Sequence, residues 1–334
     1  MNIFELTRTL VDIESVTGNE ERVAEYLLDY LSPMAMKTGG AVERLDVEPK
    51  RPNVFAYWGE PVVTFSTHID VVPPWFGSRE DEDYIYGRGS CDAKGIAAAM
   101  IHAVAKLLGE GVRGLGLLFV IGEERNSAGA FTAARSRRGS KYLINGEPTE
   151  NQLALGSKGA LRYELVARGR MAHSAYPELG ESAIEKLLDV LEAVRHIPLP
   201  DDDVLGRGSM NIGTISGGRA PNVIPDEARA EIMFRLVADC ASLRAAVKDA
   251  AAGRVEAREV LMVPAVRLGS LPGLPTTVVS FTTDIPAFAG AWGQPFLIGP
   301  GSIHVAHTLD EKVSKRQLLE AVDIYAGIAK SLLI

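Results

Sequence analysis

The 334-residue chain is poor in cysteine, in long apolar runs and in excess positive charge. Its two cysteines, Cys91 and Cys240, are too few for a disulfide framework and form no C-x-x-C pair, so we expect reduced thiols in a reducing compartment, with one isolated disulfide as the alternative. The longest apolar stretches, such as 96–100 and 115–121, fall far short of the roughly 20 residues that a membrane-spanning helix needs. The first residues include an acid where a secretory signal has basic residues, so we expect a cytoplasmic protein.

Basic residues are not in excess: 35 Lys and Arg face 43 Asp and Glu, a formal charge of −8 that argues against nucleic acid or an anionic membrane as a partner. The sequence has no P-loop, no G-x-S-x-G and no H-E-x-x-H, which excludes the common NTPase, serine-hydrolase and zincin motifs. A G-x-G-x-x-G run at 109–114 follows a predicted helix and precedes a predicted strand, the reverse of the order that binds a dinucleotide, so we interpret it as a loop. What remains is an ordinary globular composition, 46% hydrophobic and 23% charged, at a length of one large or two ordinary domains.

Predicted helices and strands alternate in the first part of the chain, which implies an α/β layer: a mostly parallel central sheet flanked by helices. From residue 158 a half-solvated strand opens a β-α-β-β-α-β order, which predicts an inserted α+β domain of the split βαβ, ferredoxin-like kind. Apolar strands return after residue 263, so we expect a discontinuous catalytic domain of 1–157 and 264–334 around an inserted domain of 158–263. The segments that support the first layer are 53–58, 62–67, 115–121 and 142–144 for strands, and 93–108 and 128–135 for helices.

Polar residues that could bind a ligand follow the predicted strands. His68-Ile69-Asp70 lies at the carboxyl end of a buried strand, where open α/β sheets bind their ligands. Because residues i and i+2 share a face, Asp70 can accept the imidazole proton of His68 and leave the second nitrogen free for a metal. Each motif alone also has a structural interpretation. A lone H-x-D is more often structural than metal-binding. Asp92, directly before a predicted helix, is by itself most simply an N-cap.

Two adjacent acids, Glu123 and Glu124, follow the predicted strand 115–121. Two adjacent buried carboxylates repel each other unless a cation or a proton lies between them, so the pair could mark a metal site. The alternative to a metal site is a pair of solvated acids near the N-terminus of the next helix. Neighbouring residues of a regular strand point to opposite faces, so a shared site requires irregular backbone here, which Gly122 allows.

Together, the residues at these strand ends predict a two-metal centre. One bridging carboxylate, plus one His and one carboxylate for each ion, gives every ion three protein ligands. Two ions roughly 3.5–4 Å apart can hold a hydroxide and polarise a carbonyl, with a nearby acid such as Glu123 to manage the proton. The predicted chemistry is metal-assisted hydrolysis. The residues that would meet are His68, Asp92, Glu124, Glu147 and a C-terminal histidine, His304 or His307.

These motifs, in this order, resemble the M20 family of metallohydrolases over nearly the whole chain, and most of all its acetylornithine deacetylase and succinyl-diaminopimelate desuccinylase branch. The resemblance implies a zinc-hydrolase catalytic domain that binds two divalent metal ions, zinc with cobalt able to substitute. His304 is the alternative to His307 as the ligand at its position, or it lines the pocket. The motifs are His68-x-Asp70, 87–95, Glu123-Glu124, 146–149 and 307–311. The resemblance implies that His68 and Glu147 bind one ion and Glu124 and His307 the other, that Asp92 bridges, that Asp70 orients and that Glu123 is the general base.

The resemblance also assigns roles within the inserted domain. Segment 171–177 is similar to the family segment whose histidine, here His173, stabilises the oxyanion and is often supplied across a dimer. Asn222 and Arg235 match residues that hold the substrate. Arg235 would form a bidentate pair with an α-carboxylate, a geometry that Lys cannot copy; the alternative is an ordinary surface arginine on a strand. The resemblance thus implies a lid and dimerisation domain, and a homodimer.

We therefore expect a dizinc amidohydrolase that removes the acyl group from an N-acyl amino acid. A glutamate at position 147, where related aminopeptidases tend to carry aspartate, favours N-deacylation or carboxypeptidase-like cleavage. The alternatives with the same metals are a carboxypeptidase or dipeptidase acting on short peptides, and a hydrolase of carrier-protein-linked amino acids. A non-catalytic binding relative is disfavoured, because such a protein has no physical need for buried carboxylates that repel each other.

Overall fold

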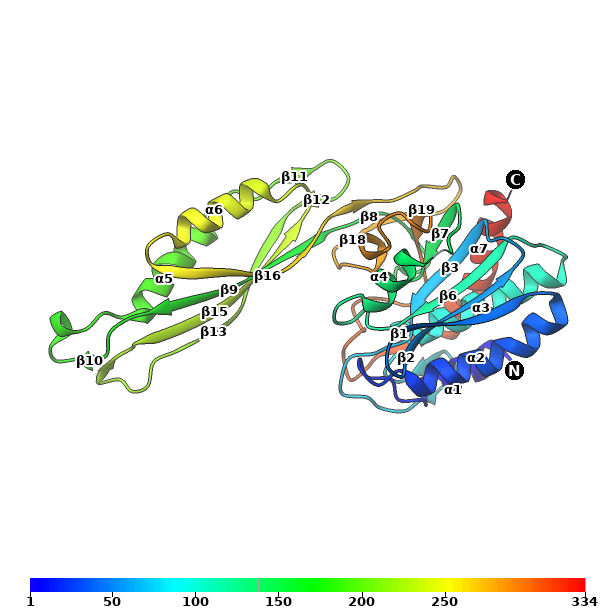
Figure 1. Ribbon diagram of the computed structural model, residues 1–334, viewed down its shortest axis with the longest axis horizontal. Helices are drawn as coiled ribbons and strands as arrows, with labels where there is room; N and C mark the ends of the chain where they lie inside the picture. Colours follow the sequence, from blue (N-terminus) through cyan, green and yellow to red (C-terminus); the bar gives the residue numbers. More distant parts are fainter. Residues whose placement is uncertain (137, 334) are drawn as a thin grey trace. The chain divides into compact units, whose positions relative to one another are not determined.

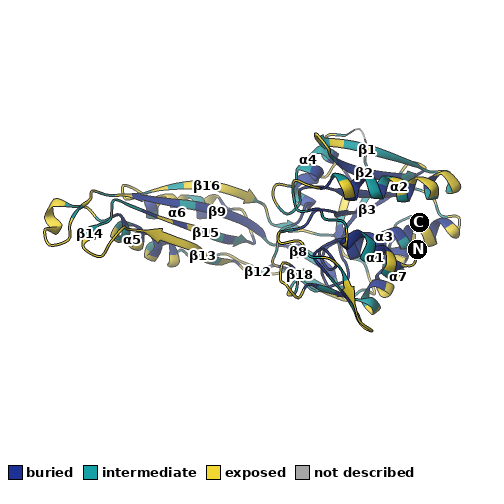
Figure 2. Ribbon diagram, turned by 90° about the horizontal axis from the view of Figure 1, so that it is seen from below, coloured by how far each residue is buried: buried dark blue, intermediate teal, exposed yellow. Residues whose placement is uncertain are grey.

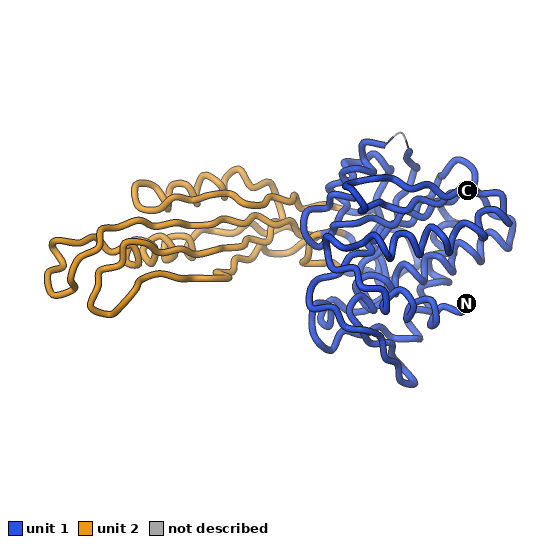
Figure 3. Tube along the Cα trace, turned by 60° about the horizontal axis from the view of Figure 1, so that its bottom comes forward, with its two compact units in different colours: residues 1–155, 268–277, 283–334 blue, residues 156–267, 278–282 orange. Residues whose placement is uncertain are grey.

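The computed structural model describes residues 1–136 and 138–333 and divides the chain into two units (Figure 3). Unit 1 comprises residues 1–155, 268–277 and 283–334, and unit 2 comprises 156–267 and 278–282. Unit 2 includes residues 156–157 and 264–267, which we expected in the catalytic domain, and likewise the separate segment 278–282. The segment joins unit 2 because its backbone accepts hydrogen bonds from residues 157 and 158, from the Ser157 hydroxyl to the Phe281 carbonyl at 2.5 Å and from the Lys158 amide to the Val279 carbonyl at 3.0 Å.

A six-stranded mixed sheet forms the centre of unit 1, in the order β1-β2-β6-β3-β7-β19 (Figure 1). β3, β6, β7 and β19 run parallel, whereas β1 and β2 pair in antiparallel fashion at one edge. All residues of β3 and of β6 are buried, which explains their continuous apolar runs. The mostly parallel α/β layer is confirmed. The strands are β1 (Ala41–Glu48), β2 (Arg51–Trp58), β3 (Val63–His68), β6 (Leu115–Val120), β7 (Tyr142–Asn145) and β19 (Gln294–Leu297).

Helices cover both faces of this sheet. One face packs against α1, α2, α3 and α7 around residues such as Phe65 and Leu117, and the other packs against α4 and the short helix η2 around Phe55 and Leu118. Figure 2 shows the resulting buried strands between partly exposed helices. The helices are α1 (Ile3–Val11), α2 (Glu21–Thr38), α3 (Lys94–Gly109), α4 (Ala128–Arg135), η2 (Ile285–Phe288) and α7 (Lys315–Leu332). A separate three-stranded sheet consists of β4 (Arg79–Glu80), β5 (Tyr84–Tyr86) and β20 (Lys312–Ser314).

Unit 2 is built on a four-stranded antiparallel sheet in the order β13-β15-β9-β16. Helices α5 and α6 pack on one face around Leu161, Leu165 and Phe234, and the other face is not covered by a helix. The chain order β9-α5-β13-β15-α6-β16 confirms the predicted split βαβ arrangement. The elements are β9 (Gly159–Arg168), α5 (Ala183–Arg195), β13 (Ser209–Gly217), β15 (Glu227–Leu236), α6 (Ala241–Ala251) and β16 (Val255–Val263).

Short elements complete the chain. A two-stranded sheet pairs β10 with β14, and another pairs β11 with β12. In residues 1–136 and 138–333, no helix has the length and apolar character needed to cross a membrane. The short elements are β8 (Leu153–Ser157), β10 (Ala172–His173), η1 (Pro177–Leu179), β11 (Asp201–Asp202), β12 (Gly206–Arg207), β14 (Val223–Ile224), β17 (Val266–Arg267) and β18 (Thr276–Val279).

Candidate active site

Three parallel strands of unit 1 end at the same edge of the sheet, and predicted site residues stand at each end. His68 is the last residue of β3, Glu123 and Glu124 follow β6, and Glu147 follows β7. Asp92 lies two residues before α3, whose N-cap is Ala93, so Asp92 is not the N-cap that its position alone suggests. Since carboxyl ends of parallel strands meet at one edge, the sheet itself gathers these side chains.

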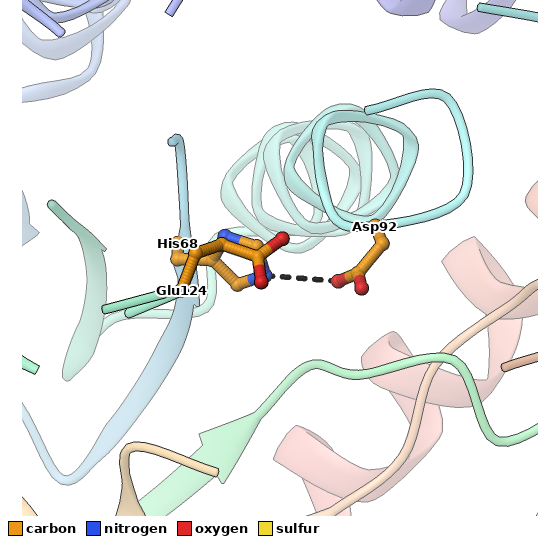
Figure 4. A group of neighbouring side chains, drawn as sticks. All are labelled: His68, Asp92 and Glu124. Carbon is orange, nitrogen blue, oxygen red and sulfur yellow. Dashed lines mark hydrogen bonds and ion pairs between the residues drawn. The ribbon is translucent and has the colours of Figure 1, made fainter. Parts of the chain in front are cut away.

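Asp92 lies between two imidazoles. Its Oδ1 is 2.9 Å from Nε2 of His68, and its Oδ2 is 3.3 Å from Nε2 of His307. The same His307 nitrogen is 3.0 Å from Oε1 of Glu124. In Figure 4 the side chains of His68, Asp92 and Glu124 point toward one another, and their donor atoms all lie within 4.8 Å. The two oxygens of one carboxylate therefore face two different histidines, as a bridging ligand requires.

The charges of these groups perturb one another strongly. Burial alone would lower the pKa of His68, yet its contacts with Asp70 and Asp92 raise that pKa well above the usual value. Hydrogen bonds with Asp92 and Glu124 raise the pKa of His307 to about 10. Burial opposes ionisation of Asp92, but the two histidines outweigh it and lower the pKa of Asp92.

Among the acids that follow the parallel strands, Glu123 and Glu147 are the two that the protein compensates least. Glu147 is only 4% exposed, and its Oε1 has no hydrogen-bond partner among the residues described. Burial raises the pKa of Glu147 well above its ordinary value. Burial and the charge of Glu147 do the same to the pKa of Glu123, which is half-buried. A buried carboxyl oxygen without a partner calls for a proton, a water or a cation.

These donors fit the predicted pair of metal ions. Imidazole nitrogens and carboxylate oxygens are the donor set that zinc and related divalent ions take. A cation would complete the unpartnered Glu147 oxygen and offset the repulsion among the carboxylates. In the proposed assignment, His68 and Glu147 hold one ion, Glu124 and His307 hold the other, and Asp92 is shared.

Asp70 mainly fixes the turn that carries the adjacent glutamates. Its carboxylate accepts hydrogen bonds from the amides of Glu123 at 3.1 Å and Glu124 at 3.3 Å, and from the Thr17 hydroxyl at 2.8 Å. Nδ1 of His68 lies 3.0 Å from the Asp70 main-chain carbonyl and 3.6 Å from its carboxylate. The imidazole is thus oriented chiefly by the backbone of Asp70, whereas the sequence analysis expected its carboxylate.

The backbone after β6 is irregular, as the adjacent acids require. Gly122 has φ 76°, in the left-handed region, and its carbonyl accepts hydrogen bonds from the amides of Asn126 and Ser127. Glu123 and Glu124 lie in the resulting turn, so their side chains are released from the alternation of a regular strand.

His304, the alternative ligand, makes none of the contacts of His307. Its side chain is exposed and forms no hydrogen bond or ion pair with any residue in 1–136 or 138–333. The geometry therefore supports His307 as the ligand.

The predicted substrate residues lie in unit 2 and are not all brought together there. His173 pairs with Val223 across β10 and β14, and the Ser174 amide donates to the Asn222 carbonyl at 3.0 Å, so His173 and Asn222 are neighbours. Arg235 is eight residues beyond Glu227, the β15 residue that pairs with the end of β9. At the rise of a strand this is about 27 Å. Within one copy of unit 2, Arg235 is thus far from the other two.

Sequence reasoning missed the role of Glu311. Its Oε1 accepts hydrogen bonds from the amides of Gly89 at 2.8 Å, Cys91 at 3.2 Å and Asp92 at 3.1 Å. Its Oε2 contacts Arg88 at 2.5 Å, and both side chains are buried. Glu311 therefore fixes the loop of Asp92 from the segment that also carries His307. The sequence did carry a signal for this role, because Glu311 is the last residue of the family motif 307–311.

Asp284 was also missed. It is 1% exposed, and neither carboxyl oxygen has a hydrogen bond of normal geometry in the described residues. Burial raises its pKa to about 7, although the nearby Ser127 side chain acts to lower that pKa. The charges of His68 and Glu124 reach it, so it lies near the candidate metal ligands. No pattern around Thr283-Asp284 indicates such a position, because nothing in a single sequence shows that this loop folds back over the β6 turn.

Comparisons with known proteins agree with this geometry. The model of peptidase family M20/M25/M40 matches residues 64–331. A peptidase M20 domain-containing protein of Schizosaccharomyces pombe is 38% identical, with 97% of this chain and 83% of that protein covered. A probable carboxypeptidase of Aspergillus flavus is 35% identical, with coverages of 98% and 86%. The solved structure of a tripeptidase from Staphylococcus aureus superposes with a TM-score of 0.82 at 20% identity, over 100% of this chain and 98% of that one, which shows the shared fold.

Proposed function

Because the chain belongs to peptidase family M20/M25/M40 and is a metal-dependent hydrolase, we propose that it is a two-metal carboxypeptidase that releases the C-terminal residue of short peptides. The observation that carries the proposal is Asp92 with one oxygen at each of two histidines, beside the unpartnered Glu147. The name of the Aspergillus flavus relative supports peptide cleavage better than the expected removal of an acyl group. The acetylornithine deacetylase and succinyl-diaminopimelate desuccinylase branch gains no support from these relatives.

Bound divalent ions would polarise the scissile carbonyl and acidify a water molecule. We assign to the Glu123 carboxylate the transfer of a proton from that water to the nitrogen of the departing amino acid. Asp70 keeps Glu123 in place through the main-chain amide. Arg235 has no acidic partner within 4 Å among the residues described, which suits it to bind a free C-terminal carboxylate.

The length of the unit 2 sheet supports a homodimer. His173 would stabilise the oxyanion of the tetrahedral intermediate, yet within one chain it lies a sheet length away from Arg235. A second copy of the chain can supply His173 to a site whose carboxylate is held by Arg235. Cytoplasmic location and zinc as the resident ion remain part of the proposal.

The test is a panel of tripeptides, their C-terminal amides, N-acetylornithine and N-succinyl-diaminopimelate, with products identified by mass spectrometry. We expect release of the C-terminal residue only from peptides with a free carboxylate, loss of the activity with chelator, and its return with zinc or cobalt. Sedimentation of the active preparation should give the mass of a dimer. Cleavage of the acyl amino acids alone, or release of the N-terminal residue, would replace the proposed activity.

A further inference from the structure

The face of the unit 2 sheet that α5 and α6 leave uncovered is divided by charge. Toward the C-terminal end of β9, its arginines have acidic partners: Arg168 lies 3.8 Å from Glu227, and Arg229 lies 3.4 Å from Glu164. Arg258 of β16 lies 3.5 Å from the same Glu164. These contacts form an ordinary, mostly exposed ion-pair network, which needs no ligand.

The other end of the same face carries two arginines without such partners. Arg162 of β9 and Arg235 of β15 have no acidic group within 4 Å in the described part of the chain, and the buried Nε of Arg162 has no hydrogen-bond partner. Arg162 pairs in register with Met233, two residues before Arg235. The two arginines are therefore diagonal neighbours, roughly 7–8 Å apart at the backbone, close enough for long side chains to reach one ligand.

The surroundings of this pair are largely apolar. Met233 of β15 and Leu261 of β16 are the register partners of Arg162 on its two sides. Ala160 of β9 and Ser209 of β13 are the register partners of Arg235. Burial lowers the pKa of Arg235, whereas ion pairs raise the pKa of Arg229 at the other end of the face. Two like charges in a half-apolar setting repel each other, and glutamines could form the same strands without that cost. An anion bound between the two arginines would offset this repulsion.

We propose that Arg162 and Arg235 form a two-arginine site for a dicarboxylic C-terminal residue, with the α-carboxylate on Arg235 and the side-chain carboxylate on Arg162. The preferred substrates are then peptides that end in glutamate or aspartate. The inference rests on the proposed carboxypeptidase activity for its substrate, and on unit 2 alone for its geometry. Met233 and Leu261 would contact the methylene groups of the same residue.

The kinetic test compares tripeptides that differ only in a C-terminal Glu, Gln or Leu. For the wild-type protein we expect the lowest KM with Glu. Arg162→Gln should raise the KM for the Glu peptide by about 10- to 100-fold and change that for the Gln peptide by about twofold or less. Arg168→Gln is the matched control, because it removes the same charge from the same face of the same strand and should leave both values within about twofold.

A binding test separates this inference from the proposed activity. Calorimetric titration of the metal-loaded protein with glutarate and with butyrate needs no turnover, so it applies even if no peptide is cleaved. Glutarate should bind more tightly than butyrate, and Arg162→Gln should abolish the difference, while Arg162→Lys, a milder change for folding, should retain part of it. Equal binding of the two acids, equal losses in Arg162→Gln and Arg168→Gln, or a changed oligomeric state in Arg162→Gln would overturn the proposal.

Discussion

Glu123 is the carboxyl on which the proposed proton transfers depend. It follows β6 in a turn held by Asp70, and burial together with the neighbouring Glu147 raises its pKa well above the usual range. A general base that must also return the proton works best when its pKa is near the operating pH. Bound cations would lower the raised pKa of Glu123 toward that range. The side chain faces charged neighbours without being one of the five proposed ligands.

Glu123→Gln should therefore lower kcat by about 10²- to 10⁴-fold, because the amide cannot accept the proton of the water. The metal content of the variant should equal that of the wild type, since no ligand is changed. Steady-state kinetics and elemental analysis of the same sample measure both. Glu150→Gln, at an exposed position close in sequence to Glu147, is the matched control and should retain full turnover. Retained activity in Glu123→Gln would show that another group moves the proton.

At the scale of the elements, the buried ion pair of Arg88 and Glu311 connects two loops that are far apart in the sequence. The pair connects the loop before α3, which presents Asp92, to the segment before β20, which presents His307. The contact spans 223 residues of sequence, so it orders the bridging carboxylate and one histidine relative to each other.

Glu311→Gln should lower the free energy of unfolding by about 3–5 kcal/mol, because it leaves a buried guanidinium without its counter-charge. Urea unfolding of the metal-free protein gives the number directly. Asp323→Asn, which breaks the exposed pair of Lys106 and Asp323, is the control and should change stability by about 0.5 kcal/mol or less. An equally small change in the free energy of unfolding of both variants would show that Glu311 does not hold the two loops together.

The longer elements could be predicted from sequence because their burial is uniform. β3 and β6 are buried along their whole length, and α3 follows Asp92 as an almost entirely buried helix. β1 was missed, since its residues alternate between half-buried and exposed at a sheet edge without an apolar run. Several short strands, among them β8, β10 and β14, were missed as well, because partners distant in the chain define them. The four-residue β7 was predicted, since all but its first residue are buried.

The site could be predicted to the extent that strand ends define it. His68, Glu124 and Glu147 follow from three parallel strands, whereas the approach of His307 to Glu124 depends on a loop packing that only the family resemblance anticipated. The Asp284 position had no sequence signal at all. Local patterns therefore predict where a strand presents a side chain, and tertiary packing decides which loops meet it.

At the scale of the whole molecule, the two units divide the work. All five proposed metal ligands belong to unit 1, and His173, Asn222 and Arg235 belong to unit 2. Metal binding should thus be a property of unit 1, while unit 2 determines which peptides are held. The metal centre comes first in the proposed mechanism, since Glu123 and Arg235 have a catalytic purpose only if the ions are present.

The most direct test is to count metal ions per chain in protein reconstituted with zinc and dialysed, for the wild type and for Glu147→Gln. We expect about two ions in the wild type and about one in the variant, whose Glu124, His307 and Asp92 remain. Peptide cleavage by the wild type should rise with metal occupancy. Glu150→Gln should match the wild type. One ion or none in the wild type, or cleavage that persists after chelation, would contradict the central claim.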